Sequence, residues 1–177
     1  MGYSRLADKL AVLPNLQAAV ADLGWTLREE SADDLDFLCQ LYCADRAAEF
    51  GFLPEAQRQF LLAQQFNARY ADYHSVKGRW FGLLIDASDR RVGHLALAWG
   101  PPALHLIDIA LSPAARGAGA GGALLRGLID DAQSQAWDVE LHVLINNPAA
   151  RLYSRLGFVP VAESPPYRAM RWRHSGG

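Results

Sequence analysis

The chain has 177 residues, of which 51% are hydrophobic and 20% charged, and its net charge is −2. This length suits one domain with its own core, and the nearly neutral charge argues against nucleic acid or an anionic membrane as the main partner. No apolar run approaches the length of a membrane span, and the first residues lack the pattern of a secretory signal.

Residue usage points to a bacterial protein of the cytoplasm. The basic residues are nearly all arginine, with lysine only at positions 9 and 77, and alanine is abundant, which is typical of a GC-rich bacterial genome. Cys39 and Cys43 lie four residues apart in a helical pattern, so they share one face of the helix. This spacing is not that of a familiar metal site, and we expect free thiols in a reducing cytoplasm.

The first half of the chain predicts an N-terminal extension followed by a strand and two helices. Residues 1–24 form a peripheral extension, helical or irregular, that Pro14 and Gly24 interrupt, and residues 25–177 form the main domain. A short strand at 25–30 leads to a helix at 32–50, which Ser31 caps. A second helix follows at 54–74.

The second half of the chain alternates between strands and helices. Strands at 79–86 and 91–99 flank a short turn and predict an antiparallel hairpin. The remaining elements are strands at 103–111 and 138–145, helices at 119–135 and 148–156, and extended segments at 157–163 and 167–173. The order is β-α-α-β-β-β-α-β-α-β-β, an α/β (α+β) fold with a mixed central sheet. The strands at 103–111 and 138–145 flank a helical crossover, so they should be parallel.

The stretch "ARGAGAGG" at residues 115–122 places four glycines where a helix begins. Gly117, Gly119 and Gly122 satisfy a dinucleotide pattern, but "SPAAR" separates them from the strand and no acidic residue ends the next strand. A P-loop is excluded, because no Gly-Lys-Ser/Thr sequence follows these glycines. The glycines therefore indicate either a pyrophosphate site made of helix N–H groups, with Arg116 adding charge, or a flexible loop without a ligand.

A second group of residues follows the strand at 138–145. Asn147 fits the N-cap and Pro148 the first position of a helix. Asn146, Ala149 and Tyr153 then share one stripe near the carboxyl end of a parallel strand, where ligands of α/β sheets tend to bind.

These two segments resemble the GNAT superfamily of N-acetyltransferases. The first family motif is approximately V-x-P-x-x-R-G-x-G-x-G-x-x-L-L, and the second is N-x-x-A-x-x-L-Y-x-x-L-G-F. The positions that match are Pro113, Arg116, Gly117, Gly119, Gly121, Leu124, Leu125, Asn146, Ala149, Leu152, Tyr153, Leu156, Gly157 and Phe158. The element order is also similar, so the resemblance covers about residues 25–173, and the first 24 residues have no counterpart.

The resemblance implies acetyl-CoA as the donor, bound where the two parallel strands separate. The pyrophosphate would contact residues 116–122 and the adjoining Ala123, and the pantetheine arm would pair with the backbone of 109–111. The residues implied in cosubstrate binding are Ile109, Ala110, Leu111, Arg116, Gly117, Ala118, Gly119, Ala120, Gly121, Gly122, Ala123, Asn146, Ala149 and Tyr153. A backbone N–H near Ala110 or Leu111 would bind the oxyanion, and Tyr153 would be the acid that protonates the CoA thiolate.

The general base is less well indicated. Asp108 is a carboxylate in an apolar strand, where desolvation would raise its pKa and suit it to this role. Alternatively, Asp108 pairs with a neighbouring histidine or caps backbone amides, and His105 is the next candidate base. A metal site made of His94, Asp108 and His142 is conceivable, but nothing else in the chain calls for a metal, and we expect none.

The sequence thus predicts an enzyme that transfers an acetyl group from acetyl-CoA to the primary amine of a small molecule or to a peptide α-amino group. The alternative is a GNAT fold that binds acyl-CoA without catalysis, as a sensor or scaffold. The sequence leaves a homodimer open and contains no motif that identifies the amine.

Overall fold

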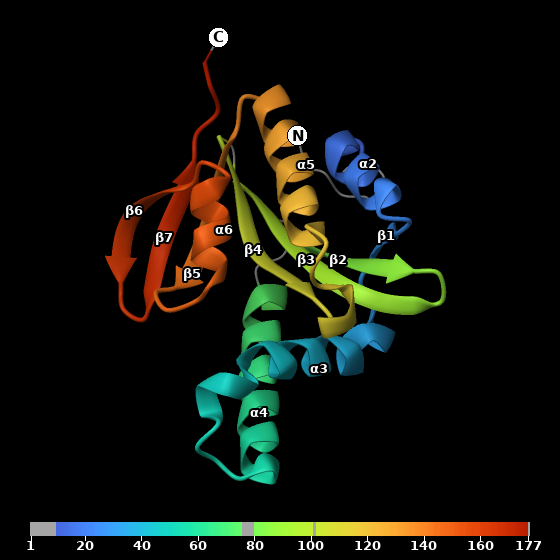
Figure 1. Ribbon diagram of the computed structural model, residues 1–177, viewed down its shortest axis with the longest axis vertical. Helices are drawn as coiled ribbons and strands as arrows, with labels where there is room; N and C mark the ends of the chain where they lie inside the picture. Colours follow the sequence, from blue (N-terminus) through green and yellow to red (C-terminus); the bar gives the residue numbers. More distant parts are fainter. Residues whose placement is uncertain (1–9, 76–79, 101, 177) are drawn as a thin grey trace.

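The structure is a computed structural model that describes residues 10–75, 80–100 and 102–176. It contains a seven-stranded sheet in the order β1-β2-β3-β4-β5-β7-β6 (Figure 1). The elements are β1 (Thr26–Glu29), β2 (Trp80–Ala87), β3 (Arg90–Gly100), β4 (Ala103–Leu111), β5 (Asp138–Leu144), β6 (Val159–Ser164), β7 (Tyr167–Trp172), α2 (Pro14–Asp22), α3 (Leu35–Arg46), α4 (Glu55–Ser75), α5 (Ala120–Ser134), α6 (Ala149–Arg155), and the 3-10 turns η1 (Ala32–Asp34), η2 (Ala47–Phe50) and η3 (Pro113–Ala115).

The expected element order and the mixed sheet are confirmed. β4 and β5 pair in parallel, and the other strand pairs are antiparallel, including the hairpin of β2 and β3. Residue 79, the expected start of the second strand, and residues 1–9 of the extension lie outside the described residues.

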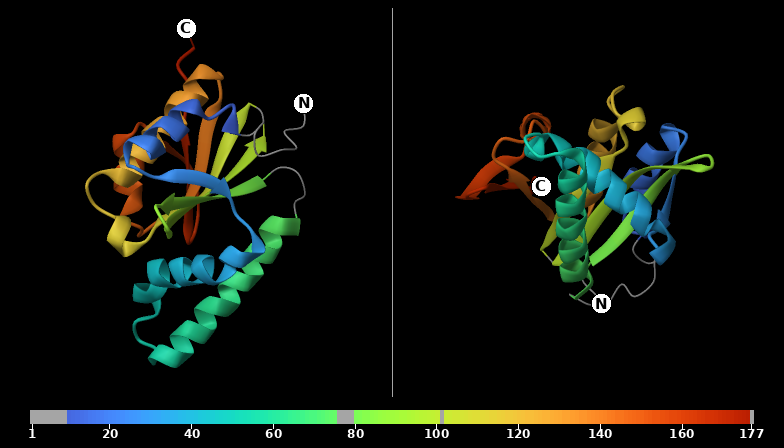
Figure 2. Two further views of the ribbon diagram at one scale, coloured as in Figure 1. Left: turned by 90° about the vertical axis from the view of Figure 1, so that its right-hand side faces the viewer. Right: turned by 90° about the horizontal axis from the view of Figure 1, so that it is seen from below.

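Helices cover both faces of the sheet (Figure 2). On one face, α2, α5 and α6 pack with the sheet into the main core, which contains Leu83 and Ile85 of β2. On the other face, α3 and α4 enclose a smaller core around Leu84. The alternation along β2 therefore directs neighbouring side chains into two different cores.

The described part of the N-terminal extension is docked on the domain, whereas the sequence predicted a peripheral segment. Leu13 and Leu16 are fully buried in the main core. The buried carboxylate of Asp131 on α5 accepts hydrogen bonds of 2.9 Å from the backbone N–H groups of Asn15 and Leu16. These N–H groups belong to the first turn of α2. Asp131, which lies on a different helix, therefore caps the N-terminus of α2.

A bulge in β4 decides which residues face α3 and α4. Ala96 of β3 pairs with Asp108 and Leu97 pairs with Leu106, so Ile107 is an extra residue. Before the bulge, Leu106 faces the main core, and after it, Ile109 does. One extra residue exchanges the two faces of a strand, and Asp108 consequently faces the α3/α4 side.

Candidate active site

A large cleft opens where β4 and β5 separate. The two strands pair only from Ala103 to Leu106 and from Asp138 to Leu141. Beyond these residues, the ends of both strands line a cleft of about 1600 Å³, which we call the main cleft. Ile109, Ala110 and Leu111 lie along it, and their strand has lost its partner on the β5 side. The backbone groups on that side are therefore available to a ligand.

The glycine-rich residues 115–122, the glycine loop, have an unusual backbone. Gly117, Ala118 and Gly119 are all left-handed, with φ of 86°, 47° and 79°, and Gly119 is the N-cap of α5. An added Cβ at Gly117 or Gly119 would meet open space, so the backbone conformation and not packing requires glycine there. A Cβ at Gly121 would meet only a Leu152 methyl, at 4.0 Å.

The start of α5 can hold an anion. The first N–H groups of a helix have no partner within it and carry a partial positive charge. Two N–H groups in this turn are already used. The N–H of the buried Ala120 donates to Gly117 O at 3.2 Å, and the N–H of the half-buried Ala123 donates to Gly119 O. The N–H groups of Gly121 and Gly122 are the remaining first-turn donors. Open space above Gly121 and donors beneath it fit a pyrophosphate group.

Arg116 lines the main cleft but is already engaged. Its Nε donates to Leu111 O at 2.8 Å, and its guanidinium group forms an ion pair with Asp45 on α3. Burial raises the pKa of Asp45, and the charge of Arg116 partly opposes this shift. Arg116 therefore ties the glycine loop to α3 in addition to placing positive charge at the cleft.

The start of α6 differs in detail from the expectation. Pro148 is the N-cap and the helix begins at Ala149, although Asn147 Oδ1 still accepts the Ala149 N–H at 2.9 Å. Ala149 and Tyr153 line the main cleft, as does Asn147. Asn146 is exposed and lies outside the lining, so the structure separates it from the other two residues of the expected stripe.

Tyr153 is buried beside the main cleft. Its ring packs edge-to-face on Phe158, with 5.8 Å between the ring centroids. Burial, with a smaller contribution from the negative charge of Asp108, raises the pKa of Tyr153 to about 12. The hydroxyl group therefore keeps its proton at neutral pH, as a general acid must.

Asp108 is a paired carboxylate. Its Oδ2 lies 3.6 Å from His94 Nδ1 on β3, and its Oδ1 lies 3.9 Å from Arg69 Nη2 on α4. Burial alone would raise the pKa of Asp108, but His94 and the two arginines nearby outweigh it and lower the pKa. The sequence-based expectation of a raised pKa is therefore wrong, and the paired alternative describes the residue.

A second, small cavity adjoins the main cleft on the α3/α4 side of the sheet. It has a volume of about 40 Å³, room for a few non-hydrogen atoms. Ala96 and Ala110 leave the space open on the strands, and aromatic rings close it from the helices. Its lining consists of Glu30, Leu38, Leu41, Tyr42, Asp45, Phe66, Arg69, Tyr70, Trp80, His94, Ala96, Asp108 and Ala110. Asp108 lies in the lining of both spaces, so it stands where they meet.

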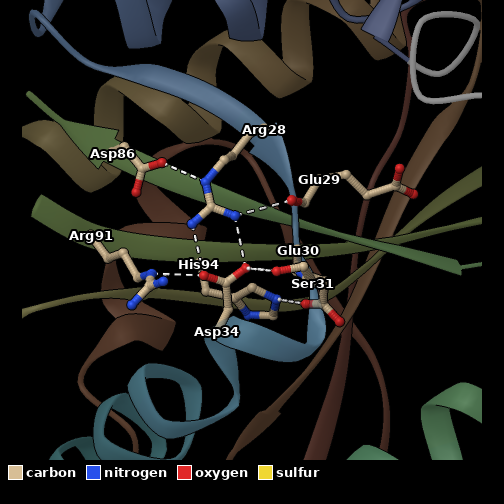
Figure 3. Close-up of polar contacts among 8 residues, drawn as sticks. All are labelled: Arg28, Glu29, Glu30, Ser31, Asp34, Asp86, Arg91 and His94. Atoms are coloured by element: carbon tan, nitrogen blue, oxygen red, sulfur yellow. Dashed lines mark hydrogen bonds and ion pairs between the residues drawn. The ribbon is translucent and has the colours of Figure 1, made fainter. Parts of the chain in front are cut away.

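A charged cluster fixes the turn from β1 into η1 and α3 (Figure 3). The buried carboxylate of Asp34 accepts two hydrogen bonds of 2.7 Å from Arg28 and one of 2.8 Å from the Ser31 N–H. Arg91 on β3 forms a further ion pair with Asp34, at 2.7 Å. Glu30 lies within this turn, and its Oε2 lies 2.8 Å from His94 Nε2. The cluster thereby directs Glu30 toward the sheet.

No local sequence pattern marks Glu30 or the helix residues of the small cavity as part of a site. Glu30 stands in the polar segment "REES", and only the fold shows that it reaches His94.

The other two histidines of the predicted site lie apart from this pair. His142 is exposed in the main cleft, and His105 Nδ1 lies 3.3 Å from Glu140 Oε2. Among the described residues, no group of three or more His, Cys, Asp or Glu side chains is arranged to hold a metal ion.

Residues 36–158 match the sequence model of the acetyltransferase (GNAT) family. This match spans more than half of the chain, and the protein therefore belongs to that family. No curated protein matches the sequence significantly. Of the helices in the described part of the chain, none combines the length and apolarity that a membrane crossing needs.

Solved structures share the fold at low sequence identity. PaiA N-acetyltransferase from Thermoplasma acidophilum, solved in complex with coenzyme A, is 15% identical with a TM-score of 0.65, covering 85% of this chain and 99% of that one. An acetyltransferase from Thermus thermophilus is 17% identical with a TM-score of 0.61 and coverages of 84% and 96%. The ribosomal-protein-S18-alanine N-acetyltransferase from Escherichia coli is 19% identical with a TM-score of 0.57 and coverages of 86% and 96%.

Proposed function

We propose that this protein is an N-acetyltransferase that moves the acetyl group of acetyl-CoA to a primary amine of a small molecule or to a peptide α-amino group. The observation that carries the proposal is the separation of β4 from β5, which opens the main cleft with Asp108, Tyr153 and, from the glycine loop, Arg116 among its lining residues. Membership of the GNAT family and the coenzyme A bound to the PaiA relative support acyl-CoA as the donor.

The donor would lie along the main cleft. The N–H groups of Gly121 and Gly122 would hold the pyrophosphate, and the unpaired edge of β4 at Ile109–Leu111 would pair with the pantetheine amides. The backbone N–H of Leu111, on the side of β4 away from β3, would then stabilise the oxyanion that forms on the acetyl carbonyl. Gly117, Ala118 and Gly119 set the direction in which the first turn of α5 presents its donors.

The amine would approach from the small cavity and lose its proton to Asp108. A carboxylate with a lowered pKa is ionised at neutral pH but is a weak base. It therefore accepts the proton only as the N–C bond forms and makes the N–H acidic. Tyr153 would donate its proton to the departing thiolate, so that the products are the acetylated amine and free CoA.

Two measurements test this function. Acetyl-CoA at 100 times its Kd should stabilise the protein by roughly 2.7 kcal/mol, and NAD should not. A panel of primary amines should then show amine-dependent release of the CoA thiol. Stabilisation by NAD and not by acetyl-CoA would refute the donor. Binding of acetyl-CoA without transfer to any amine would favour the sensor or scaffold alternative.

A further inference from the structure

The side chain of Glu30 is a buried carboxylate at the edge of the small cavity. It is only 5% exposed. Its Oε1 accepts a hydrogen bond of 3.2 Å from the Tyr70 hydroxyl on α4. It also packs tightly over Gly82 of β2, because a Cβ at that position would lie 1.9 Å from Glu30 Oε2. Burying a charge costs several kcal/mol unless partners compensate, so this carboxylate is held by specific partners at a specific place.

His94 connects Glu30 to Asp108. Its side chain is 12% exposed, its Nε2 lies 2.8 Å from Glu30 Oε2, and its Nδ1 lies 3.6 Å from Asp108 Oδ2. An imidazolium ion donates from both ring nitrogens, which matches a carboxylate on each side. Burial opposes this charge, but the two carboxylates outweigh it and raise the pKa of His94 to about 9.

Other charged and titratable groups face this chain from the elements packed against it. Arg69 lies 3.9 Å from Asp108 and also donates to Ile107 O at 3.4 Å. Further groups of the described residues that act on these three residues or line the same cavity are Tyr42, Asp45 and Arg46 on α3, Tyr70 on α4 and Tyr153 on α6. His94 lies between the two carboxylates, with Nε2 facing Glu30 and Nδ1 facing Asp108.

We propose that Glu30 and His94 are positioning residues for acetyl transfer, which hold the Asp108 carboxylate ionised and turned toward the amine. This inference rests on the proposed function. During the reaction, the N–H bond of the amine breaks as its N–C bond forms, and the proton moves to Asp108. Because Asp108 is 34% exposed, it can return the proton to water in the main cleft. His94 keeps both of its ring protons and Glu30 its negative charge throughout.

The negative charge of Glu30, and not only its shape, is needed to keep His94 protonated. Glu30→Gln keeps the size of the side chain and an oxygen that accepts from His94 Nε2, but it removes the negative charge. The pKa of His94 should therefore fall, and His94 should lose its proton at a lower pH. A merely structural glutamate would leave the pH dependence unchanged. Glu29→Gln is the matched control, because its exposed side chain points away from His94 (Figure 3).

The experiment uses the full chain with the best acceptor from the amine panel. We expect kcat/KM of wild type to fall above about pH 9, and that of Glu30→Gln to fall earlier. Relative to pH 7, the loss at pH 9 should be about fivefold greater in Glu30→Gln, and Glu29→Gln should follow wild type. An unchanged pH profile in an active Glu30→Gln would overturn this inference alone, whereas a wild type that acetylates no amine would overturn the proposed function and this inference with it.

A second measurement is independent of the acceptor. The His94 imidazole is titrated by NMR in wild type and Glu30→Gln, and a lower pKa in the variant is the expected result. Should Glu30→Gln fold poorly by circular dichroism, Asp108→Asn replaces it, since it removes the other carboxylate beside His94. A His94 pKa equal to that of wild type in the folded variant would overturn the inference.

Discussion

Single residues at this site take their properties from partners that are distant in the sequence. Asp108 alone in the apolar segment "LIDIAL" suggests a carboxylate with a raised pKa, whereas its contacts with His94 and Arg69 lower the pKa. Tyr153 shows the opposite effect, because burial and a nearby negative charge both favour its neutral form. The proposed base is therefore ionised and the proposed acid protonated over the same neutral pH range.

The hydroxyl of Tyr153 is the subject of the first prediction. Tyr153→Phe keeps the ring and its packing on Phe158 but removes the acid, so kcat should fall by roughly 10²–10⁴ with little change in acetyl-CoA affinity. Tyr167→Phe, which removes a hydroxyl from another tyrosine of the main cleft, is the control and should stay near wild type. A Tyr153→Phe enzyme within twofold of wild-type kcat, with chemistry rate-limiting, would leave Tyr153 a packing residue.

The second prediction concerns Asp34 and protein stability. The hydrogen bond from Arg28 is the main reason that the pKa of Asp34 lies well below its ordinary 3.8, and burial only partly opposes it. Because the folded pKa is the lower one, Asp34 stabilises the protein above about pH 4, and this contribution is lost as the pH falls further. Asp34→Asn should lose about 2–4 kcal/mol at pH 7, less than for a wholly buried pair because its arginine partners are over one-third exposed.

Denaturant unfolding at several pH values measures this effect. Wild type should lose stability below pH 4 more steeply than Asp34→Asn. Asp33→Asn, which changes the exposed neighbouring carboxylate, should unfold like wild type. Equal stability of Asp34→Asn and wild type at pH 7 would show that the cluster around Arg28 contributes little to folding.

At the scale of the elements, irregular backbone creates the site. The bulge at Ile107 turns Asp108 toward α3 and α4, and the loss of pairing beyond Leu106 opens the main cleft. Ala118 has a left-handed backbone that costs a non-glycine residue of order 1 kcal/mol or more, and it lies between two left-handed glycines. Strain of this kind is typical of ligand sites, and here it directs the N-terminus of α5.

The third prediction tests the glycine loop as part of the donor site. Gly121→Val would fill the open space over the first turn of α5, where an added Cβ meets only Leu152 at 4.0 Å. The fold should survive, and the thermal shift with acetyl-CoA should disappear. Gly176→Val adds the same side chain in open space on the C-terminal tail and should keep the shift. A folded Gly121→Val protein that still binds acetyl-CoA like wild type would place the pyrophosphate elsewhere.

At the scale of the whole molecule, the periodicity of the sequence predicted the element order and the parallel strand pair. These features depend on local patterns, which a sequence displays directly. The phase change in "HLIDIA", where Leu106 and Ile107 are adjacent apolar residues, was a visible signal of the bulge. The pairing of Asp108 with His94 and the burial of Glu30 depend on contacts across the sheet, which no local pattern reveals.

The docking of the N-terminal extension also depends on contacts between distant segments, which its local sequence pattern does not reveal. Residues 10–24 read as peripheral because Pro14 and Gly24 interrupt them, yet Leu13, Leu16 and Val20 belong to the main core. The docking depends on Gly127 in the middle of α5, where sequence alone suggests only a weakened helix. In the structure, a Cβ at Gly127 would lie 2.7 Å from Asn15 O and 2.9 Å from Leu16 Cα. Gly127 therefore lets two helices approach backbone to backbone.

The last prediction follows from this contact. Alanine is intrinsically better than glycine in a helix by about 1 kcal/mol, but at Gly127 its methyl group must displace the backbone of α2. Gly127→Ala should therefore lower the free energy of unfolding by about 1–3 kcal/mol. It should also speed hydrogen exchange at the amides of Asn15 and Leu16, which donate to Asp131. Gly122→Ala is the matched control in the same helix, because its Cβ meets the flexible end of Arg126 at 3.4 Å and no backbone of another helix. It should be as stable as wild type or up to about 1 kcal/mol more stable. If both variants are stabilised alike, α2 does not rest on α5 at Gly127, and the extension would be the peripheral segment that its sequence suggests.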